Sequence, residues 1–393
     1  MMKLGEIRPL AAFLGAVLVL GGACATRSVT AARPAAVNTD RVVLDPAGAA
    51  ASEDGKTLWF DALDIGLEGQ AWTGLKHPYD RLPAEAEGKV PEKVWTLSRH
   101  SAGLSVGFVT DSPTIAVRWS LRLEDLAMNH MAATGVSGVD LYAKQGETWR
   151  WVATGRPEKV KDNEKVLVDG APAGRHEYRL NLPLYNATDS VQIGVQPGST
   201  LMKASVYPRE LAKPMLFWGT SILQGGCASR PGMAYPSIIG RRMHRPVINL
   251  GFSGAGRMDP EVTALVAPLA VSIFVIDCLP NMTPDLVKER TEPLVRALRA
   301  AQRDTPIVLV ESTIYEYCWF VAKQAKAIKD KNDALRAAYE RLARAGVKNL
   351  HYLRADGLLG GDREATVDGG HATDLGFLRM ADGIEPVLRK ILK

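Results

Sequence analysis

The sequence predicts an α/β domain built on a doubly wound parallel five-stranded sheet, preceded by an all-β sandwich or jelly-roll domain. In residues from about 56 to 208, apolar residues alternate with their neighbours, and turn signals separate the alternating stretches. From about 213 onward, short apolar runs alternate with segments of helical period, as in βα repeats. We therefore expect two domains, at 56–208 and 213–393.

The composition is that of an ordinary globular protein, with 46% hydrophobic and 23% charged side chains among 393 residues. The formal net charge is only +5, and Lys and Arg are spread among Asp and Glu. A nucleic-acid-binding protein concentrates positive charge, so we predict no nucleic-acid partner. His and Cys do not occur at the spacing of a zinc site, and the pattern calls for no metal and no cofactor.

The first 25 residues have the pattern of an export signal peptide. Basic residues precede an apolar run at 10–20 that is too short to span a membrane comfortably, and small residues follow it. Either the signal is cleaved in the ordinary way, or Cys24 is lipidated as in bacterial lipoproteins. We expect an exported protein, periplasmic or extracellular, with membrane attachment only through a lipidated Cys24. Residues 26–55, rich in Ala, Thr, Pro and Val without period, are predicted to form a flexible linker.

Three apolar alternations in the first region predict strands that turn one face toward the core of the sandwich. They are Leu104, Val106 and Phe108; Ile115, Val117 and Trp119; and Val191, Ile193 and Val195. Turn-forming pairs such as Asp169-Gly170 separate the runs. Trp149 and Trp151 have the same spacing, which favours packing in the sandwich over stacking on sugars.

Five apolar runs in the second region predict buried parallel strands. They span residues 215–218, 247–250, 273–276, 307–310 and 350–353. The helices between and after them have recognisable ends. Asp259-Pro260 and Thr283-Pro284 each place a capping residue before a proline at the first helical position, and a later helix stops at Gly346. This alternation gives the doubly wound sheet.

The residues that directly follow the predicted strands carry the candidate chemistry, because such sheets bind ligands at the carboxyl ends of their strands. Ser221 follows the first strand, and Asp368 and His371 share one loop ahead of the last helix. Acyl transfer needs a nucleophile, a base that takes its proton and a carboxylate that orients the base. We therefore predict a catalytic triad of Ser221, His371 and Asp368.

Donors for an oxyanion hole also follow the first three strands. The candidates are the backbone N–H groups of Ser221 and Gly254 and the side-chain amide of Asn281. Each has an alternative role. Gly254 could simply provide a positive φ, as could the nearby Gly251 and Gly256, and Asn281 could cap the helix that starts near residue 283.

Cys227 and Cys278 follow the ends of the first and third predicted strands, in loops that should approach the same cleft. In an oxidising compartment the two residues could form a disulfide. They could equally remain two small buried thiols.

The clusters after the strands resemble the conserved blocks of SGNH (GDSL-type) hydrolases in their order. Residues 219–225, Gly-Thr-Ser-Ile-Leu-Gln-Gly, are similar to the first block, with Thr220 where the GDSL form has Asp. Asn281 matches the third block, although Pro280 replaces the usual Gly, and Asp368-x-x-His371 matches the fourth. The resemblance implies a flavodoxin-like three-layer SGNH fold and a serine esterase activity.

Residues 138–142, Gly-Val-Asp-Leu-Tyr, resemble the GxDLY signature of a β-domain found ahead of certain bacterial GDSL-like lipase/acylhydrolase domains. That domain is accessory in the family. Because residues 219–371 supply every catalytic part, we expect the β-domain to position substrate and not to perform chemistry. His130 and Asp140 are its candidate substrate-binding residues, with a structural role for Asp140 in a turn as the alternative.

The resemblance favours an exported esterase that hydrolyses short-chain acyl esters, in particular acetyl groups on carbohydrate. Its substrate would be a small acyl ester or an acetylated carbohydrate. Among enzymes, a lysophospholipase or thioesterase would need a longer apolar groove, and an O-acetyltransferase would have to exclude water. Outside enzymes, the alternative is a carbohydrate-binding surface protein whose β-domain does the binding.

Overall fold

The computed structural model describes residues 42–204 and 207–393. The predicted signal peptide, Cys24 and most of the predicted linker lie outside these residues. In the remaining part of that linker, regular structure begins ahead of residue 56, with η1 (Pro46–Gly48) and β1 (Ala50–Ala51). Strand β1 pairs with β2 (Leu58–Asp61), so sheet hydrogen bonds order a segment that the sequence predicted to be flexible.

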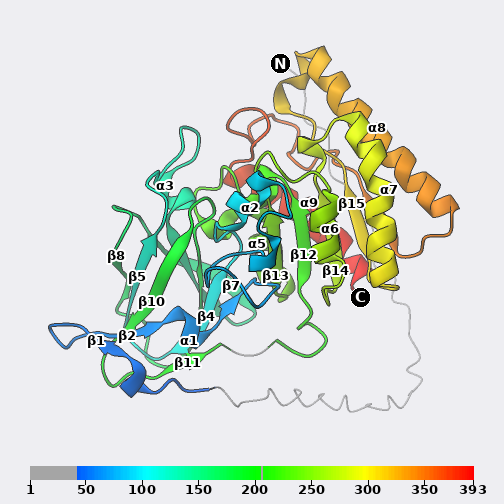
Figure 1. Ribbon diagram of the computed structural model, residues 1–393. Helices are drawn as coiled ribbons and strands as arrows, with labels where there is room; N and C mark the ends of the chain where they lie inside the picture. Colours follow the sequence, from blue (N-terminus) through cyan, green and yellow to red (C-terminus); the bar gives the residue numbers. More distant parts are fainter. Residues whose placement is uncertain (1–41, 205–206) are drawn as a thin grey trace, which may run out of the picture. The chain divides into compact units, whose positions relative to one another are not determined.

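Two antiparallel sheets form the sandwich of the first region (Figure 1), as predicted. One has the strand order β1-β2-β10-β5-β8 and the other β11-β4-β9-β6-β7, with β3 paired to β4. The remaining strands are β3 (Leu67–Glu68), β4 (Ser105–Thr110), β5 (Thr114–Leu121), β6 (Val139–Gln145), β7 (Thr148–Gly155), β8 (Asn163–Asp169), β9 (His176–Asn181), β10 (Thr188–Val195) and β11 (Leu201–Lys203). The short helices are α1 (Ala62–Ile65), η2 (Ala84–Ala86), α2 (Glu92–Ser98) and α3 (Ala133–Val136).

The alternating apolar residues meet between the two sheets. Phe108 of β4 and Trp119 of β5 are at most 1% exposed, and Val191 of β10 is fully buried. Phe108 also stacks on Tyr178 of β9, with ring centroids 5.4 Å apart. Burying side chains of this size contributes about 1.5–3 kcal/mol each, so the alternation read from the sequence forms the core of the sandwich.

The second region contains the predicted parallel five-stranded sheet. Its order, β13-β12-β14-β15-β16, places the second strand at one edge and the first beside it, as in a flavodoxin-like sheet. The strands are β12 (Met215–Gly219), β13 (Val247–Gly251), β14 (Ile273–Asp277), β15 (Ile307–Val310) and β16 (Leu350–Leu353). Each begins at the residue that the apolar runs predicted.

Helices cover both faces of this sheet (Figure 1). They are α4 (Ser221–Gln224), α5 (Tyr235–Met243), α6 (Pro260–Val266), α7 (Pro284–Ala301), α8 (Ala322–Arg344) and α9 (Asp374–Ile391), with 3-10 turns η3 (Pro231–Met233), η4 (Leu279–Asn281) and η5 (Glu316–Trp319) between them. The predicted ends are found. Thr283 caps α7 by accepting a hydrogen bond from Leu286 N, and Gly346, with φ of +79°, follows the end of α8.

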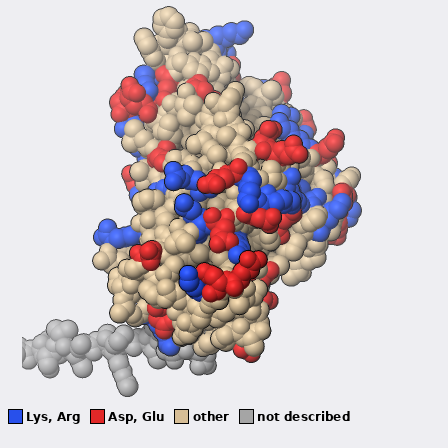
Figure 2. Space-filling model, turned by 90° about the vertical axis from the view of Figure 1, so that its left-hand side faces the viewer, with Lys and Arg blue, Asp and Glu red and all other residues tan. Residues whose placement is uncertain are grey.

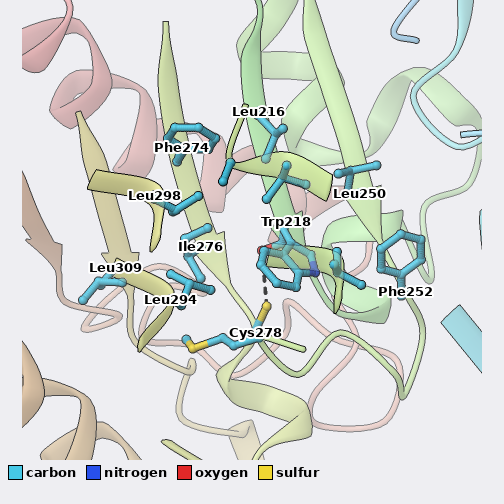
Figure 3. Packing of buried hydrophobic residues seen from close by; sticks show 14 of the residues in the cluster. Leu216, Trp218, Leu250, Phe252, Phe274, Ile276, Cys278, Leu294, Leu298 and Leu309 are labelled. Atoms are coloured by element: carbon cyan, nitrogen blue, oxygen red, sulfur yellow. Dashed lines mark hydrogen bonds between the residues drawn. The ribbon is translucent and has the colours of Figure 1, made fainter. Parts of the chain in front are cut away.

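Strand β12 shows why the sheet needs both layers. Leu216 and Trp218 pack with helices α6, α7 and α8, whereas Met215 and Phe217 pack with α5 and α9. Figure 3 shows the first of these packing clusters, in which the Sγ of Cys278 lies 3.5 Å from the backbone oxygen of Trp218. A strand that is apolar on both faces can only be stable between two helical layers.

Both cores of the α/β region include side chains from the first region. Val94 and Trp95 of α2 pack with the cluster around Trp218, and Leu184 and Tyr185 pack with the cluster around Phe217. The described residues, 42–204 and 207–393, accordingly belong to one compact unit. The change of sequence period near residue 210 marks a change of architecture within one packed body.

Arg81 is central to this shared packing. Its guanidinium is 2% exposed and donates four hydrogen bonds to backbone oxygens. Two acceptors, on His100 and Leu97, belong to the first region, and two, on Asn249 and Gly251, belong to strand β13. A buried cation with this many acceptors ties the edge of the parallel sheet to the sandwich.

Acidic and basic side chains are interspersed on the face that Figure 2 shows, as the composition predicted. Within residues 42–204 and 207–393, the structure contains no helix that is both long and apolar enough to cross a membrane.

Candidate active site

Ser221 is the first residue of α4, and only Thr220 separates it from β12, at a sharp turn from strand to helix. Two glycines permit this turn. A Cβ on Gly219 would lie 2.4 Å from the backbone oxygen of Asp277, and a Cβ on Gly256 would lie 1.8 Å from the oxygen of Gly219. Such close backbone approaches exclude any side chain, which holds Ser221 at the carboxyl end of the central strands.

Ser221, His371 and Asp368 form a continuous hydrogen-bonded chain. The Oγ of Ser221 lies 2.8 Å from Nε2 of His371, and Nδ1 of His371 lies 2.7 Å from Oδ2 of Asp368. His371 lies 150 positions after Ser221 in the sequence, in the loop ahead of α9. Both distances are those of normal hydrogen bonds between a nucleophile, a base and the group that orients it.

The carboxylate of Asp368 is held in its charged form. Partial burial raises its pKa, but hydrogen bonds from the backbone N–H groups of His371 and Gly370 and from the imidazole outweigh burial and lower the pKa to about 2. Asp368 therefore stays ionised throughout the pH range in which esterases work, and it can stabilise a proton on Nδ1 of His371.

The loop that carries Asp368 and His371 packs against residues 315–317, which the sequence analysis did not identify as part of the site. The N–H of Glu316 donates to the backbone oxygen of Gly369 at 2.8 Å, and its carboxylate accepts from Ala365 N at 2.9 Å. Gly369 has φ of +92°, and a Cβ there would lie 2.2 Å from the ring of Tyr317. These contacts join residues about fifty positions apart, so sequence periodicity carries no signal for them.

The three glycines that follow β13 have different structural roles. Gly251 packs on the backbone of Gln224, and Gly256 packs on Gly219, so close approach explains both. Gly254 has φ of +66° and lies under the side chain of Lys93, whose Nζ would be 2.8 Å from a Cβ at this position. Of these three glycines, Gly254 is the one whose backbone N–H lies within hydrogen-bonding distance of the side-chain oxygen of Asn281.

Asn281 ends the short helix η4 and does not cap α7, whose cap is Thr283. The amide group is oriented so that both its oxygen and its nitrogen have suitable hydrogen-bond partners. In this orientation Oδ1 accepts hydrogen bonds from Ala255 N at 3.1 Å and Gly254 N at 3.3 Å. In the same orientation the amide nitrogen of Asn281 faces hydrogen-bond acceptors. The loop itself is held by Gln224, whose Oε1 accepts from Ser253 N at 3.0 Å.

Two residues of the first region lie against the triad. The imidazole of His130 meets that of His371 edge to face, with ring centroids 5.7 Å apart. The hydroxyl of Tyr185 donates to the backbone oxygen of Ser221 at 3.0 Å. His130 was a predicted substrate-binding residue, and the structure brings it to the site. Tyr185 was missed, because nothing in the local sequence links it to a residue 36 positions later.

Asp140 does not reach the cleft. It is fully buried on β6, where its carboxylate accepts from Arg230 Nη1 at 2.7 Å, Gly232 N at 3.0 Å and Asn181 Nδ2 at 3.0 Å. Burial raises its pKa, and the charge of Arg230 opposes that effect. Asp140 therefore has a structural role and not the predicted contact with a substrate: it fastens the sandwich to the loop that follows α4. It does so from a strand, not from a turn.

Trp149 and Trp151 correct a second prediction, because neither packs in the core of the sandwich. Trp151 is 50% exposed, and the guanidinium of Arg230 lies 5.4 Å from its ring. Trp149 has cations over its ring, Arg179 at 5.0 Å and Lys144 at 5.9 Å from the ring centroid. Their alternation has the period of a strand, but it belongs to the outer face of β7.

Cys227, Cys278 and Cys318 are buried free thiols. Cys227 and Cys278 are therefore two separate buried thiols and do not form a disulfide, which is the second of the alternatives that the sequence left open. The described part of the chain contains no cluster of His, Cys, Asp and Glu that could hold a metal ion.

Asp277, at the end of β14, is a buried acid next to the site. Burial raises its pKa to about 7 from an ordinary 3.8, although a 2.8 Å hydrogen bond from the hydroxyl of Tyr235 lowers it. Between these values the folded state holds a proton that the unfolded state releases. The contribution of Asp277 to stability is therefore present below about pH 4 and is lost as the pH rises toward 7.

We expect Asp277→Asn, which removes this titration, to flatten the pH dependence of the melting temperature between about pH 4 and 7. Above pH 7 the variant should be at least as stable as the wild type, because no buried charge forms. Melting curves over this range measure the effect, with the exposed Asp64→Asn as a control that leaves the profile unchanged. Parallel profiles for Asp277→Asn and the wild type would contradict the assignment.

A parallel α/β sheet with serine, histidine and aspartate linked at the carboxyl ends of its strands defines a hydrolase of the SGNH class. Comparison with known proteins gives the same result. Residues 212–389 match the GDSL-like Lipase/Acylhydrolase family, and residues 57–201 match the N-terminus of Esterase_SGNH_hydro-type. The chain belongs to the GDSL-like lipase/acylhydrolase family and is a carboxylic ester hydrolase.

Solved structures include several that are similar to this chain. A protein from Bacteroides ovatus described as a GDSL-like lipase is 36% identical, over 86% of this chain and 98% of its own, with a TM-score of 0.80. A salicylyl-acyltransferase from a tetracycline biosynthetic pathway is 19% identical over 87% and 97%, with a TM-score of 0.68. A family two carbohydrate esterase from Clostridium thermocellum is 12% identical over 74% and 92%, with a TM-score of 0.54. The last two share the fold. No curated protein sequence matches the chain.

Proposed function

We propose that this protein is an exported serine esterase that removes short acyl groups, above all acetyl, from carbohydrate. In this proposal Ser221 is the nucleophile, His371 the general base and acid, and Asp368 the group that orients His371. The observation that carries the proposal is the chain of two hydrogen bonds, 2.8 and 2.7 Å long, from Ser221 Oγ through His371 to Asp368.

Acylation begins when Ser221 Oγ attacks the carbonyl carbon of the ester and His371 Nε2 takes the hydroxyl proton. The charged Asp368 stabilises the imidazolium and keeps the remaining proton on Nδ1. The tetrahedral intermediate then expels the alcohol, which receives the proton from His371. Ser221 is left as an acyl ester. A water molecule, deprotonated by His371, attacks that ester and releases the carboxylic acid and free Ser221.

The negative charge on the carbonyl oxygen needs donors during both steps. In our proposal these are the backbone N–H groups of Ser221 and Gly254 and the amide N–H of Asn281. The turn at Ser221 leaves its N–H free of helical partners, since it lies in the first turn of α4. Closing of the oxyanion hole would require Gly254 to exchange its bond with Asn281 Oδ1 for one to the substrate.

Two observations support a carbohydrate substrate. Structures with the same fold include carbohydrate esterases of family two and an acetyl xylan esterase from Butyrivibrio proteoclasticus. In addition, the loop that supports Asp368 ends in Trp319 and Phe320, which are 69% and 78% exposed. Exposed aromatic faces beside a catalytic loop are suited to stack on sugar rings of a polymer.

Hydrolysis of p-nitrophenyl esters of increasing chain length, beside acetylated polysaccharides, tests this proposal with the wild type and Ser221→Ala. We expect the highest kcat/KM for acetate and a steep decline with chain length. A maximum at eight carbons or more would favour a lysophospholipase or thioesterase. Added alcohols distinguish an O-acetyltransferase, because acyl transfer to them would then exceed hydrolysis. Membership of a family of ester hydrolases leaves a purely carbohydrate-binding protein without support.

Export and the processing of Cys24 form a separate part of the proposal. They rest on the apolar segment at 10–20 and the small residues after it, which lie outside the described residues. Mass spectrometry of the mature protein distinguishes the alternatives. A lipidated N-terminal Cys24 indicates membrane anchoring, and an N-terminus beyond it without lipid indicates a released protein. An unprocessed N-terminal methionine would contradict export.

Asn281→Ala should lower kcat by about 10²-fold or more, with little change in KM, because an oxyanion donor acts on charge that exists only in the transition state. Asn281→Asp is the informative partner variant. It keeps an oxygen that can accept from Gly254 and Ala255 but removes the N–H groups. If Asn281 only supports the loop, Asn281→Asp will retain wild-type kcat, and the assigned donor role is then incorrect.

A further inference from the structure

A pocket of about 580 Å³ lies between the β6–β7 hairpin and helices α5 and α9. Its lining includes Tyr142 and Trp149 from the hairpin, Arg241 from α5, and Leu378 and Arg389 from α9, and it contains none of the triad residues. Four arginines and two glutamates line it in all.

Arg241 is the unusual member of this set. It is only 9% exposed, and its guanidinium stacks on the ring of Tyr142 at 4.0 Å. Its Nη1 has no hydrogen-bond partner among the described residues. The three other arginines each pair with a carboxylate at 2.7 Å: Arg230 with Asp140, Arg242 with Asp382, and Arg389 with Glu385.

Trp149, whose side chain also lines the pocket, carries a second unpartnered donor. Its Nε1 is buried and, within the described part of the chain, makes no hydrogen bond. Leaving a buried donor unpaired destabilises the folded protein, and the effect is larger for a charged group. Two such donors around one cavity indicate that an acceptor from outside the chain completes the site, and a negatively charged acceptor suits the guanidinium best.

The pocket is also too large for an inorganic ion alone. Apolar side chains of Met233, Ile238 and Leu378 form part of its wall. A ligand that fills it must combine an anionic group with apolar surface.

We propose that this pocket binds an organic oxyanion, a carboxylate or phosphate group attached to an apolar body, with Arg241 and Trp149 as donors to the anion. The site is separate from the proposed esterase chemistry, and it can be tested by binding alone. Occupation would bridge the β6–β7 hairpin to α5 and α9 and stabilise the folded protein by mass action.

Isothermal titration of the wild-type protein with benzoate, phenyl phosphate, inorganic phosphate and the neutral benzamide tests the proposal, with melting temperatures as a second measurement. We expect benzoate or phenyl phosphate to bind and to raise the melting temperature, and benzamide not to bind. Preference between the first two identifies the anion as carboxylate or phosphate. Inorganic phosphate binding as tightly as phenyl phosphate would overturn the requirement for an apolar body.

Variants decide which residues hold the anion. Arg241→Met should weaken binding by about tenfold or more, and Trp149→Phe, which keeps the ring but removes the N–H, by about threefold. Arg118→Met, at a half-buried arginine of the sandwich that pairs with Glu164, should leave binding unchanged. If Arg241→Met does not fold, Arg241→Lys and Trp149→Phe answer the question. Failure of every anion to bind the wild type, or unchanged affinity in the Arg241 and Trp149 variants, would overturn the proposal.

Discussion

Replacing Ser221 with Ala is expected to lower kcat/KM for p-nitrophenyl acetate by roughly 10⁴-fold to 10⁶-fold. The variant loses the nucleophile, so the acyl-enzyme route closes, and only binding and the oxyanion donors remain to assist direct attack by water. Stability should not change, because the hydroxyl has a single side-chain partner, His371 Nε2. Steady-state kinetics and melting curves on the same preparation measure both effects.

Ser229→Ala is the matched control for this experiment. Ser229 lies in the loop just beyond α4, and its hydroxyl donates to the carboxylate of Asp374 and not to His371. We expect that variant to retain activity within a few-fold of the wild type. A fluorophosphonate should label Ser221 alone in the wild-type protein and no residue in Ser221→Ala. Wild-type turnover in Ser221→Ala, or labelling at another serine, would show that the nucleophile is elsewhere.

The parts of the structure that the sequence predicted are those whose signals are local. The strand β12 is a run of apolar residues, and a parallel sheet brings whatever follows its strands to one edge. Asp368 and His371 are three positions apart in one loop, so their contact needs no distant element. Of the two hydrogen bonds, only the one between His371 and Ser221 joins distant parts of the sequence. Sheet topology predicted it, because both residues lie at the carboxyl ends of the strands.

The residues that the sequence did not reveal act across long separations. Tyr185 and Glu316 support the site through backbone contacts with other loops. Trp151 has the spacing of a core residue but faces outward. The period of a strand predicts that alternate residues share a face, but it does not predict which face turns toward the core. Long separation also hid the role of Asp140, because its partners Arg230 and Gly232 lie about ninety positions later in the sequence.

The boundary between the two regions shows this limit most clearly. A chain that starts at Ala212 contains the whole predicted triad, and from sequence alone it would be expected to hydrolyse a small ester. The packing predicts otherwise. Such a chain loses Trp95 and Val94 from one core of the α/β region and Leu184 and Tyr185 from the other. Removing even one large buried side chain costs about 3–5 kcal/mol, which is a large part of the stability of a domain.

We therefore expect the chain that starts at Ala212 to be insoluble or unfolded and to lack activity even on p-nitrophenyl acetate. Circular dichroism and kinetics on the purified fragment measure this. A folded fragment with wild-type kcat/KM on the small ester would contradict the shared core, and the first region would then be an accessory domain after all.

Arg81→Met tests the same dependence in the full-length chain. Methionine fills much of the space but leaves four buried backbone oxygens without a donor, on His100, Leu97, Asn249 and Gly251. We expect the free energy of unfolding to fall by about 3 kcal/mol or more, since each unpaired buried acceptor costs about 1–3 kcal/mol and relaxation recovers part of the loss. Arg118→Met, at a half-buried arginine of β5 whose partner is the exposed Glu164, should change it by less than about 1 kcal/mol. Similar urea midpoints for the two variants would mean that Arg81 does not join the two regions. If Arg81 acts as we infer, activity in Arg81→Met should decline together with stability, because Asn249 and Gly251 lie on the strand that leads to the Gly254 loop.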